Sequence, residues 1–324
     1  MPTQAGVDLT RAGRLLRSRT VDPSQGRDSA RRLVVVFVSY NSSLDLDRAL
    51  GSLVETTPDG MVKAVVVENG ADVEATRVVC EHYGSQLLIP ERNLGYGLAA
   101  NLVGREVRGE YFAVSNPDVV FLPDTIRLLL DFMDGHPDAG VVAPQFLYPD
   151  GTPQPSARRK PSLRYVLAGR RSPFVQLLGP GRRAQEFLYA GSEQSPKPIP
   201  VEAVVGTLML FRRRAFLEVG GFDSDYFMFA EDIDICLRLA PRWSVYLLPQ
   251  AQLVHAVGSA RKNLRIITEF HRLRSLRRLF LRSYGRMAGI MIGLGFACYL
   301  GVLMWLALFG VGEREHTWQS RSRT

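Results

Sequence analysis

The chain has 324 residues, with 40 Lys and Arg against 32 Asp and Glu, so its formal net charge at pH 7 is +8. The length suffices for a large α/β domain with an appendage, and the basic excess keeps nucleotide phosphates, nucleic acid and lipid headgroups among the candidate partners. The three cysteines, Cys80, Cys236 and Cys298, form no CxxC pair and no cluster with histidine. Their spacing argues against a disulfide framework or a structural zinc site and favours a reducing compartment.

The first thirty residues predict a disordered basic leader. Arginines are scattered among Gly, Ser, Pro and Asp, and no apolar run interrupts them. We therefore expect residues 1–30 to lie outside the folded part, with no secretory signal ahead of it.

Apolar runs of strand length then alternate with segments of helical periodicity. Strands are expected at 33–38, 63–67, 86–89 and 111–114, and helices at 44–53, 73–83 and 98–107. Polar residues follow successive strands, in VSYN at 38–41, VENG at 67–70 and SNPD at 115–118. This pattern predicts an open, mostly parallel α/β sheet flanked by helices, in which ligands bind at the carboxyl ends of the strands.

The second half is less regular. Residues 144–200 are rich in Pro, Gly, Arg and Ser, and they predict a long functional excursion. An apolar segment at 203–211, a helix that begins near Arg213 and apolar runs at 245–248 and 253–254 follow it.

A loop and a strand end provide candidate ligand contacts. The segment RNLGYG at 92–97 leads into a helix, where backbone groups can approach a nucleotide closely. No GxGxxG run follows the first strand, which disfavours a hydride-transfer enzyme. Asn116 and Asp118 offer oxygen ligands for a hard divalent cation, and the alternative is an ordinary Asx-Pro turn.

Three carboxylates crowd one short apolar stretch. If a helix begins at Glu231, then Glu231 and Asp234 share a face while Asp232 points elsewhere. Apolar neighbours raise the pKa of a carboxylate, which is how a general base is tuned. The alternative is capping and stabilisation of the helix dipole. His255, after the last apolar run, is either a structural histidine or an acceptable ligand for Mg²⁺ or Mn²⁺.

The C-terminal region predicts one transmembrane helix. No charged residue occurs from 287 to 312, and about twenty apolar residues cross a bilayer core of ~30 Å. A basic juxtamembrane segment at 261–286 precedes this span and a short tail at 313–324 follows it, which places the large N-terminal part in the cytoplasm. The same arginines suit anionic lipid. The alternative is an apolar hairpin in a soluble core.

In order, these segments, together with GGFD at 220–223, EDID at 231–234 and HAVGS at 255–259, resemble the inverting family 2 glycosyltransferases of GT-A fold. SNPD and the segment PSARRKPSL at 155–163 resemble the bacterial rhamnosyltransferase-like branch. The resemblance covers residues 33–262 and implies a GT-A domain at 31–260, with a nucleotide-binding half at 31–130 and an acceptor half at 131–260.

The resemblance also implies residue roles. It makes Asp232 the catalytic base, with Glu231 beside it to position the acceptor or tune the base. It makes Asp118 and His255 ligands of Mg²⁺ or Mn²⁺. The residues implied to contact the nucleotide sugar are Ser39, Tyr40, Asn41, Glu68, Asn93, Gly95, Gly97, Asn101 and Asn116.

The implied reaction is one inverting displacement, with L-rhamnose from dTDP-rhamnose as the expected donor and a lipid-linked or cell-envelope saccharide as the acceptor. The expected place is the cytoplasmic face of a bacterial membrane, with the chain crossing once. Galactofuranose, mannose or another deoxysugar are alternative donors. A single span is too few for a polymerising synthase, and a non-catalytic membrane scaffold is a remote alternative. Nucleic-acid binding is disfavoured, because the arginines gather beside the span and in the leader, without aromatic residues interleaved.

Overall fold

The structure is a computed structural model that describes residues 33–162, 187–189, 191–192, 195–256, 265–295 and 301. The chain divides into two compact units, residues 1–275 and 276–324, each of which is described by itself. The expected leader at 1–30, the tail at 313–324 and most of the expected span at 287–312 lie outside the described residues.

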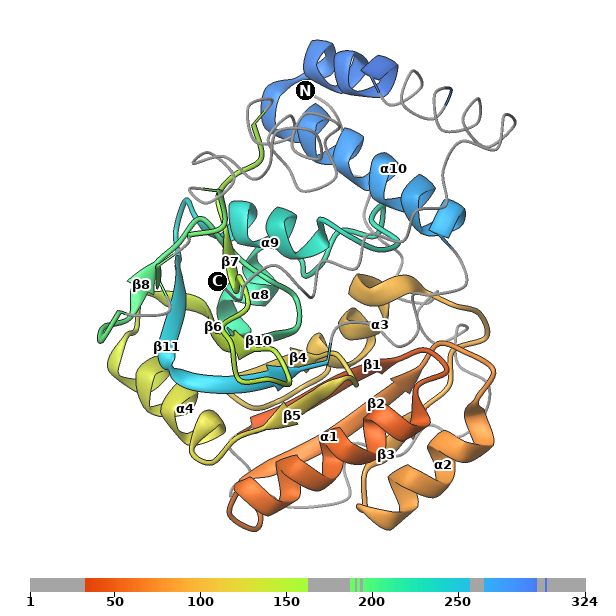
Figure 1. The fold of residues 1–324 in the computed structure, drawn as a ribbon, viewed down its shortest axis with the longest axis vertical. Helices are drawn as coiled ribbons and strands as arrows, with labels where there is room; N and C mark the ends of the chain where they lie inside the picture. Colours follow the sequence, from red (N-terminus) through yellow and green to blue (C-terminus); the bar gives the residue numbers. More distant parts are fainter. Residues whose placement is uncertain are drawn as a thin grey trace, which may run out of the picture. The chain divides into compact units, whose positions relative to one another are not determined.

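Up to residue 115 the helices and strands follow one another as the alternation of apolar runs predicts, whereas those at 119–147 were not predicted (Figure 1). They are β1 (Leu33–Ser39), α1 (Ser43–Thr56), β2 (Val62–Glu68), α2 (Val73–His82), β3 (Gln86–Leu88), α3 (Gly95–Gly104), β4 (Tyr111–Ser115), β5 (Val119–Phe121), α4 (Thr125–Gly135), β6 (Ala139–Leu147), β7 (Ala157–Arg158), β8 (Ile199–Pro200), β9 (Ala203–Val204), β10 (Leu208–Arg212), α8 (Arg213–Glu218), α9 (Glu231–Leu239), β11 (Ser244–His255) and α10 (Arg265–Tyr284).

A nine-stranded sheet forms the centre of the larger unit, in the order β3-β2-β1-β4-β10-β6-β11-β5, with β8 paired to β11. Strands β3, β2, β1 and β4 are parallel to one another, as are β6 and β11. Strand β10 runs antiparallel between β4 and β6, and β5 runs antiparallel to β11. The expected mostly parallel α/β sheet is therefore confirmed, with β10 as the reversal that separates its two halves.

Burial explains why these residues form these elements. The β-branched run of β1 is buried along almost its whole length, as expected for a strand covered on both faces. In α1, the apolar residues at helical spacing, Leu46, Ala49, Leu50 and Leu53, are the buried ones. Each such leucine contributes about 1.5–3 kcal/mol when it is removed from water, so the apolar face holds α1 against the sheet.

The reversed strand determines where the site forms. Leu208, at the start of β10, pairs with Ser115 at the end of β4, and the N–H of Asn116 donates to the carbonyl of Thr207 at 2.9 Å. On the other side of the sheet, His255 of β11 pairs with Val119 of β5. Because Val119 follows Asp118, this pairing brings the histidine to the same corner of the sheet.

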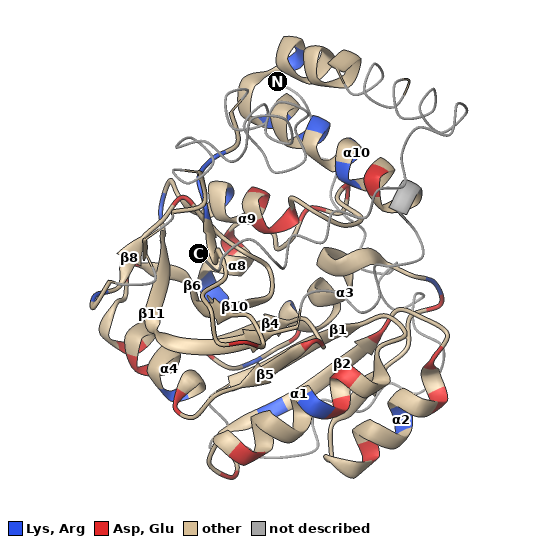
Figure 2. Ribbon diagram, viewed as in Figure 1, with Lys and Arg blue, Asp and Glu red and all other residues tan. Residues whose placement is uncertain are grey.

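The basic segment expected beside the membrane is largely helical, since α10 spans Arg265–Tyr284. In the ribbon of Figure 2, Lys and Arg positions are blue at several places along it. Within the part of the chain that the structure describes, no helix is both long and apolar enough to cross a bilayer.

Candidate active site

Gly206 connects the acidic start of α9 with Tyr96 at the start of α3. Its N–H donates to Oδ2 of Asp232 at 2.9 Å, and its carbonyl accepts the hydroxyl of Tyr96 at 2.5 Å. A Cβ atom on Gly206 would lie 3.2 Å from the Cβ of Asp232. The close approach of α9 to the segment before β10 therefore favours a residue without a side chain.

Helix α9 begins at Glu231, as the spacing of the carboxylates predicts, and Figure 2 shows acidic residues gathered at its start. The two residues before it, Phe229 and Ala230, have φ values of 67° and 65°. Left-handed backbone costs about 1–2 kcal/mol for a residue with a side chain. This strained turn sets the direction in which the side chains of Glu231 and Asp232 point from the start of α9.

Glu231 and Asp232 are neighbours with unequal partners. Asp232 accepts the N–H of Gly206 and, through Oδ1, the N–H of Ile233 at 2.8 Å. Glu231 is 8% exposed, and its Oε2 atom has no hydrogen-bond partner among the described residues. The carboxylate of Asp232 is therefore held in place by backbone donors, whereas that of Glu231 has a buried oxygen without a hydrogen-bond partner among the described residues.

Burial raises the pKa of both Glu231 and Asp232. It raises the pKa of Glu231 to about 8, and the negative charge of Asp232 adds to this rise. Burial also raises the pKa of Asp232, but the two backbone donors and the guanidinium of Arg158 oppose the rise. Paired carboxyls in unequal environments take different protonation states. The arrangement favours a proton on Glu231 and a negative charge on Asp232.

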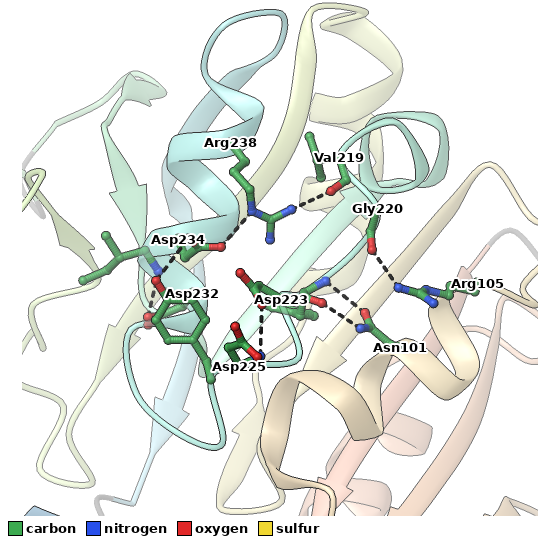
Figure 3. Close-up of polar contacts among 12 residues, drawn as sticks. Asn101, Arg105, Val219, Gly220, Asp223, Asp225, Asp232, Asp234 and Arg238 are labelled. Atoms are coloured by element: carbon green, nitrogen blue, oxygen red, sulfur yellow. Dashed lines mark hydrogen bonds and ion pairs between the residues drawn. The ribbon is translucent and has the colours of Figure 1, made fainter. Parts of the chain in front are cut away.

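The third carboxylate of the cluster, that of Asp234, is bonded to other side chains of the protein. Asp234 is buried, accepts Nε of Arg238 at 2.7 Å and accepts the hydroxyl of Tyr226 at 3.2 Å. Arg238 also donates to the carbonyl of Val219 at 2.6 Å. These contacts, drawn in Figure 3, hold α9 against the loop at 219–227.

The same loop is held from the opposite side by α3 (Figure 3). The amide of Asn101 donates to the carbonyl of Phe222 at 2.8 Å and accepts its N–H at 2.9 Å. A Cβ atom on Gly97 would lie 2.8 Å from the Cβ of Phe222, and one on Gly95 would clash with the carbonyl of Phe227. Asn101, Gly95 and Gly97 were expected to contact the nucleotide sugar, but the structure gives them contacts with the 219–227 loop. Their expected contact with the nucleotide sugar stays a prediction.

Asp118 and His255 meet at the corner formed by β4, β5 and β11. Nε2 of His255 lies 3.5 Å from Oδ1 of Asp118, and the two side chains are 12% and 16% exposed. Nδ1 of His255 contacts Oε1 of Gln154 at 3.0 Å. A carboxylate oxygen and an imidazole nitrogen that face each other suit a divalent cation. No group of three or more metal-binding side chains occurs among the residues that the structure describes. Asp118 and His255 are therefore considered as a pair of candidate ligands.

Tyr96 lies at the start of α3, and its hydroxyl donates to the carbonyl of Gly206. Burial raises the pKa of this hydroxyl well above the ordinary value, and the charges of Glu231, Asp232 and Asp118 raise it further. The expected convergence of the 231–234 cluster, the SNPD corner and His255 on one pocket stays a prediction.

The residues at the tips of β1 and β2 form a closed network. Glu68 is buried and accepts the hydroxyls of Ser39 and Thr76 and the N–H groups of Asn41 and Gly70, at 2.6–3.1 Å. Asn41 has a φ of 51°, and its Oδ1 accepts two N–H groups from residues 71 and 72. Four hydrogen bonds saturate the Glu68 carboxylate, so it shapes the loops at this edge of the sheet.

The remaining predicted contacts lie near the surface of this edge. The ring of Tyr40 is 44% exposed. The side chain of Asn93 accepts the N–H of Gly95 at 2.8 Å, and Asn116 is partly buried beside Thr207. Sequence reasoning missed Asn69, whose amide binds the backbone of Leu94 and Gly95. It also missed Gly206 and Gln154, because no local pattern marks residues whose partners lie far along the chain.

An open α/β sheet with a carboxylate pair, an Asp–His pair and polar loops at the same edge is the arrangement of a nucleotide-sugar transferase. Residues 34–220 match the model of the family described as Glycosyl transferase family 2. The chain belongs to this family, as its ordered motifs indicated, and is a glycosyltransferase.

Two bacterial relatives make the comparison more specific. The N-acetylglucosaminyl-diphospho-decaprenol L-rhamnosyltransferase of Mycobacterium tuberculosis is 34% identical over 238 residues, which are 69% of this chain and 75% of the relative. Rhamnosyltransferase WbbL of Escherichia coli is 25% identical over 216 residues, which are 64% of this chain and 76% of the relative.

A solved structure supports the fold. The mannosyltransferase PcManGT of Pyrobaculum calidifontis, in complex with GDP-Man and Mn²⁺, matches 85% of this chain and 70% of its own, with a TM-score of 0.54 and 20% identity. The likeness concerns the fold alone and confirms a GT-A-like α/β architecture.

Proposed function

We propose that the chain transfers L-rhamnose from dTDP-rhamnose, with inversion, to a lipid-linked or cell-envelope saccharide at the cytoplasmic face of a bacterial membrane. The name of the mycobacterial relative, an L-rhamnosyltransferase acting on a diphospho-decaprenol saccharide, supports this donor and acceptor class. The observation that carries the proposal is the Glu231–Asp232 pair, in which one carboxylate is held by backbone donors and the other has a buried oxygen without a partner.

In the proposed reaction Asp232 is the general base. Its carboxylate takes the proton from an acceptor hydroxyl while that oxygen attacks the anomeric carbon from the face opposite the leaving diphosphate. One displacement inverts the configuration. The N–H groups of Gly206 and Ile233 stabilise the anionic form of Asp232 before the proton arrives.

Glu231 supports the base in the same step. In its protonated form its carboxyl group can donate a hydrogen bond, and we assign this bond to a second oxygen of the acceptor sugar. A neutral Glu231 also avoids a second negative charge next to Asp232. In this proposal Glu231 binds the acceptor and Asp232 deprotonates it.

Asp118 and His255 have the chemistry to hold Mg²⁺ or Mn²⁺, because an anionic oxygen and an imidazole nitrogen face each other across 3.5 Å. When bound, such an ion neutralises negative charge on a departing diphosphate. On the donor side, we assign nucleotide contacts to the exposed ring of Tyr40 and to Asn41, Asn93 and Asn116. Ser39 and Glu68 support that surface from within.

Membrane attachment rests on the unit formed by residues 276–324. In the described helical turns after Gly285, the residues Met287, Ile290, Met291 and Leu294 are exposed, at helical spacings of three and four. An apolar stripe of this kind, followed by a charge-free sequence up to residue 312, fits insertion into lipid. We propose that this part holds the enzyme where lipid-linked acceptors are concentrated.

The donor can be tested by thermal unfolding of the full chain with Mn²⁺ and a panel of nucleotide sugars. A ligand that binds the native state raises the midpoint according to its affinity, so we expect the largest shift with dTDP-rhamnose. A larger shift with a UDP- or GDP-sugar would contradict the proposed donor while leaving the transferase class intact.

The role of Asp232 can be tested by Asp232→Asn. Loss of a general base lowers kcat by about 10²–10⁴-fold, and binding of the donor should change little because the residue acts in the transition state. Asp131→Asn on α4, where the carboxylate is 56% exposed, is the control for removing a charge. Turnover at the wild-type rate in Asp232→Asn would remove this residue from the proposed role.

A further inference from the structure

Gln154 is a buried residue in the 144–200 excursion, to which the sequence assigned no role. Its side chain is 7% exposed. The amide nitrogen donates to the carbonyl of His255 at 2.8 Å and lies 3.4 Å from the carbonyl of Leu147. Both carbonyls can only accept, so they determine which end of the amide is nitrogen. The oxygen must therefore face the imidazole of His255, where it lies 3.0 Å from Nδ1.

The backbone of Gln154 is also held in place. Its N–H donates to the carbonyl of Phe146 at 2.7 Å, and its carbonyl accepts Nε2 of Gln145 at 2.6 Å. With backbone and side chain both bonded to strand β6 and to β11, the amide has little freedom to turn over. The direction of Oε1 is consequently a fixed property of the site.

An amide oxygen can only accept, so Nδ1 of His255 carries the hydrogen. In a neutral imidazole this leaves Nε2 with a free electron pair. That atom faces Oδ1 of Asp118 at 3.5 Å, so a nitrogen electron pair and a carboxylate oxygen lie side by side. This is a donor set that suits a divalent cation.

We propose that Gln154 is a positioning residue, which holds His255 in the tautomer protonated at Nδ1 so that Nε2 is free to bind a divalent cation together with Asp118. This inference rests on the metal use proposed above. Residues that orient a metal-binding histidine typically contribute a factor of about 10–100 in metal affinity. Gln154 does not touch the ion and acts through His255.

The experiment uses the full chain and three variants. Gln154→Leu removes both ends of the amide. Gln154→Glu keeps an acceptor for Nδ1 and remains informative if the leucine variant does not fold. Ser52→Ala is the control, because Ser52 is also buried and hydrogen-bonded to two backbone groups but is bonded to neither Gln154 nor His255.

Two measurements are made on each protein. The ¹⁵N shifts of the His255 imidazole, recorded at neutral pH without metal, report the tautomer. Titration with Mn²⁺ in the presence of dTDP reports metal affinity. We expect the Nδ1–H tautomer in the wild type, in Gln154→Glu and in Ser52→Ala. In Gln154→Leu we expect a shift towards the Nε2–H tautomer and about 10–100-fold weaker Mn²⁺ binding.

The inference is overturned if wild-type His255 carries its hydrogen on Nε2. It is also overturned if Gln154→Leu matches Ser52→Ala in both tautomer and Mn²⁺ affinity. Wild-type protein with the Nδ1–H tautomer but without Mn²⁺ uptake would contradict the proposed metal use, while a tautomer change in Gln154→Leu would still support the control of His255 by Gln154.

Discussion

Glu231 and Asp232 are adjacent in the chain, yet their surroundings differ in the way an acid and a base require. Two backbone N–H groups bind Asp232, whereas Oε2 of Glu231 is buried without a partner among the described residues. The difference arises because Gly206 approaches only one of them. At the residue scale, therefore, the chemistry depends on a backbone donor as much as on the carboxylates.

This difference predicts a pH dependence of stability. The pKa of Glu231 rises from 4.5 to about 8 on folding, so the folded chain holds a proton that the unfolded chain releases in this interval. Stability should be highest below pH 4.5 as far as this group is concerned, and should fall as the pH rises towards 8. Glu231→Gln cannot titrate and should lose less thermal stability between pH 5 and pH 8.

Unfolding midpoints of wild type and Glu231→Gln across this pH range would check the prediction. Glu106→Gln, which removes an exposed carboxylate on the surface, is the control. Parallel pH profiles for the wild type and Glu231→Gln would show that Glu231 is ionised in the folded chain, and the assignment of the proton would then be wrong.

At the scale of elements, the 219–227 loop joins helix α3 to helix α9. Asn101 of α3 and Arg238 of α9 bind its backbone from opposite sides (Figure 3). Arg238 and Asp234 form an ion pair four residues apart, with side chains 15% and 1% exposed. Arg214 and Glu218 of α8 have the same spacing, but Arg214 is 79% exposed.

The two pairs predict different costs for the same substitution. Arg238→Met leaves the buried Asp234 without its main cation and releases the carbonyl of Val219, so it should lower the free energy of unfolding by about 3–5 kcal/mol. Arg214→Met should have little effect, because solvent screens an exposed pair. Chemical denaturation of both variants provides the measurement. Similar stability losses in the two variants would mean that the contacts of Arg238 with Asp234 and Val219 add nothing to the free energy of unfolding.

At the scale of the whole molecule, membrane attachment is a property of the C-terminal unit. Leu300→Arg combined with Leu303→Arg places two charges in the apolar sequence from 287 to 312. Each charge costs about 2.5–3.5 kcal/mol at the centre of a bilayer. The double variant should therefore leave the pellet after alkaline extraction of membranes, whereas the wild type should remain in it.

A second double variant controls for added charge. Val54→Arg with Val78→Arg changes two apolar residues that are 53% and 60% exposed on α1 and α2, and it should sediment as the wild type does. If the wild type itself were extracted by alkali, the proposed single span would be wrong and attachment would have to be peripheral.

Predictions from local patterns succeeded where one segment carries the whole signal. The β-branched run at 33–38 became β1, and the spacing of apolar residues at 44–53 became α1. The expected start of a helix at Glu231 is also confirmed. By contrast, Asn101 lies in the helix expected at 98–107, but α3 begins earlier, at Gly95, and so also contains Gly97. Both residues contact Phe222, more than a hundred residues away. Residue type and local spacing could not indicate that partner.

The sequence by itself determined the order of strands and helices, the family and the residues able to carry charge at the strand ends, because periodicity, β-branching and ordered motifs are local properties of the chain. Only the tertiary structure decided which of those groups meet. The antiparallel course of β10 brings Gly206 to Asp232 and to the tip of β4, and the pairing of β11 with β5 brings His255 to Asp118. These contacts depend on how strands pair across the sheet, and the free energy of that pairing comes from the packing of the whole core.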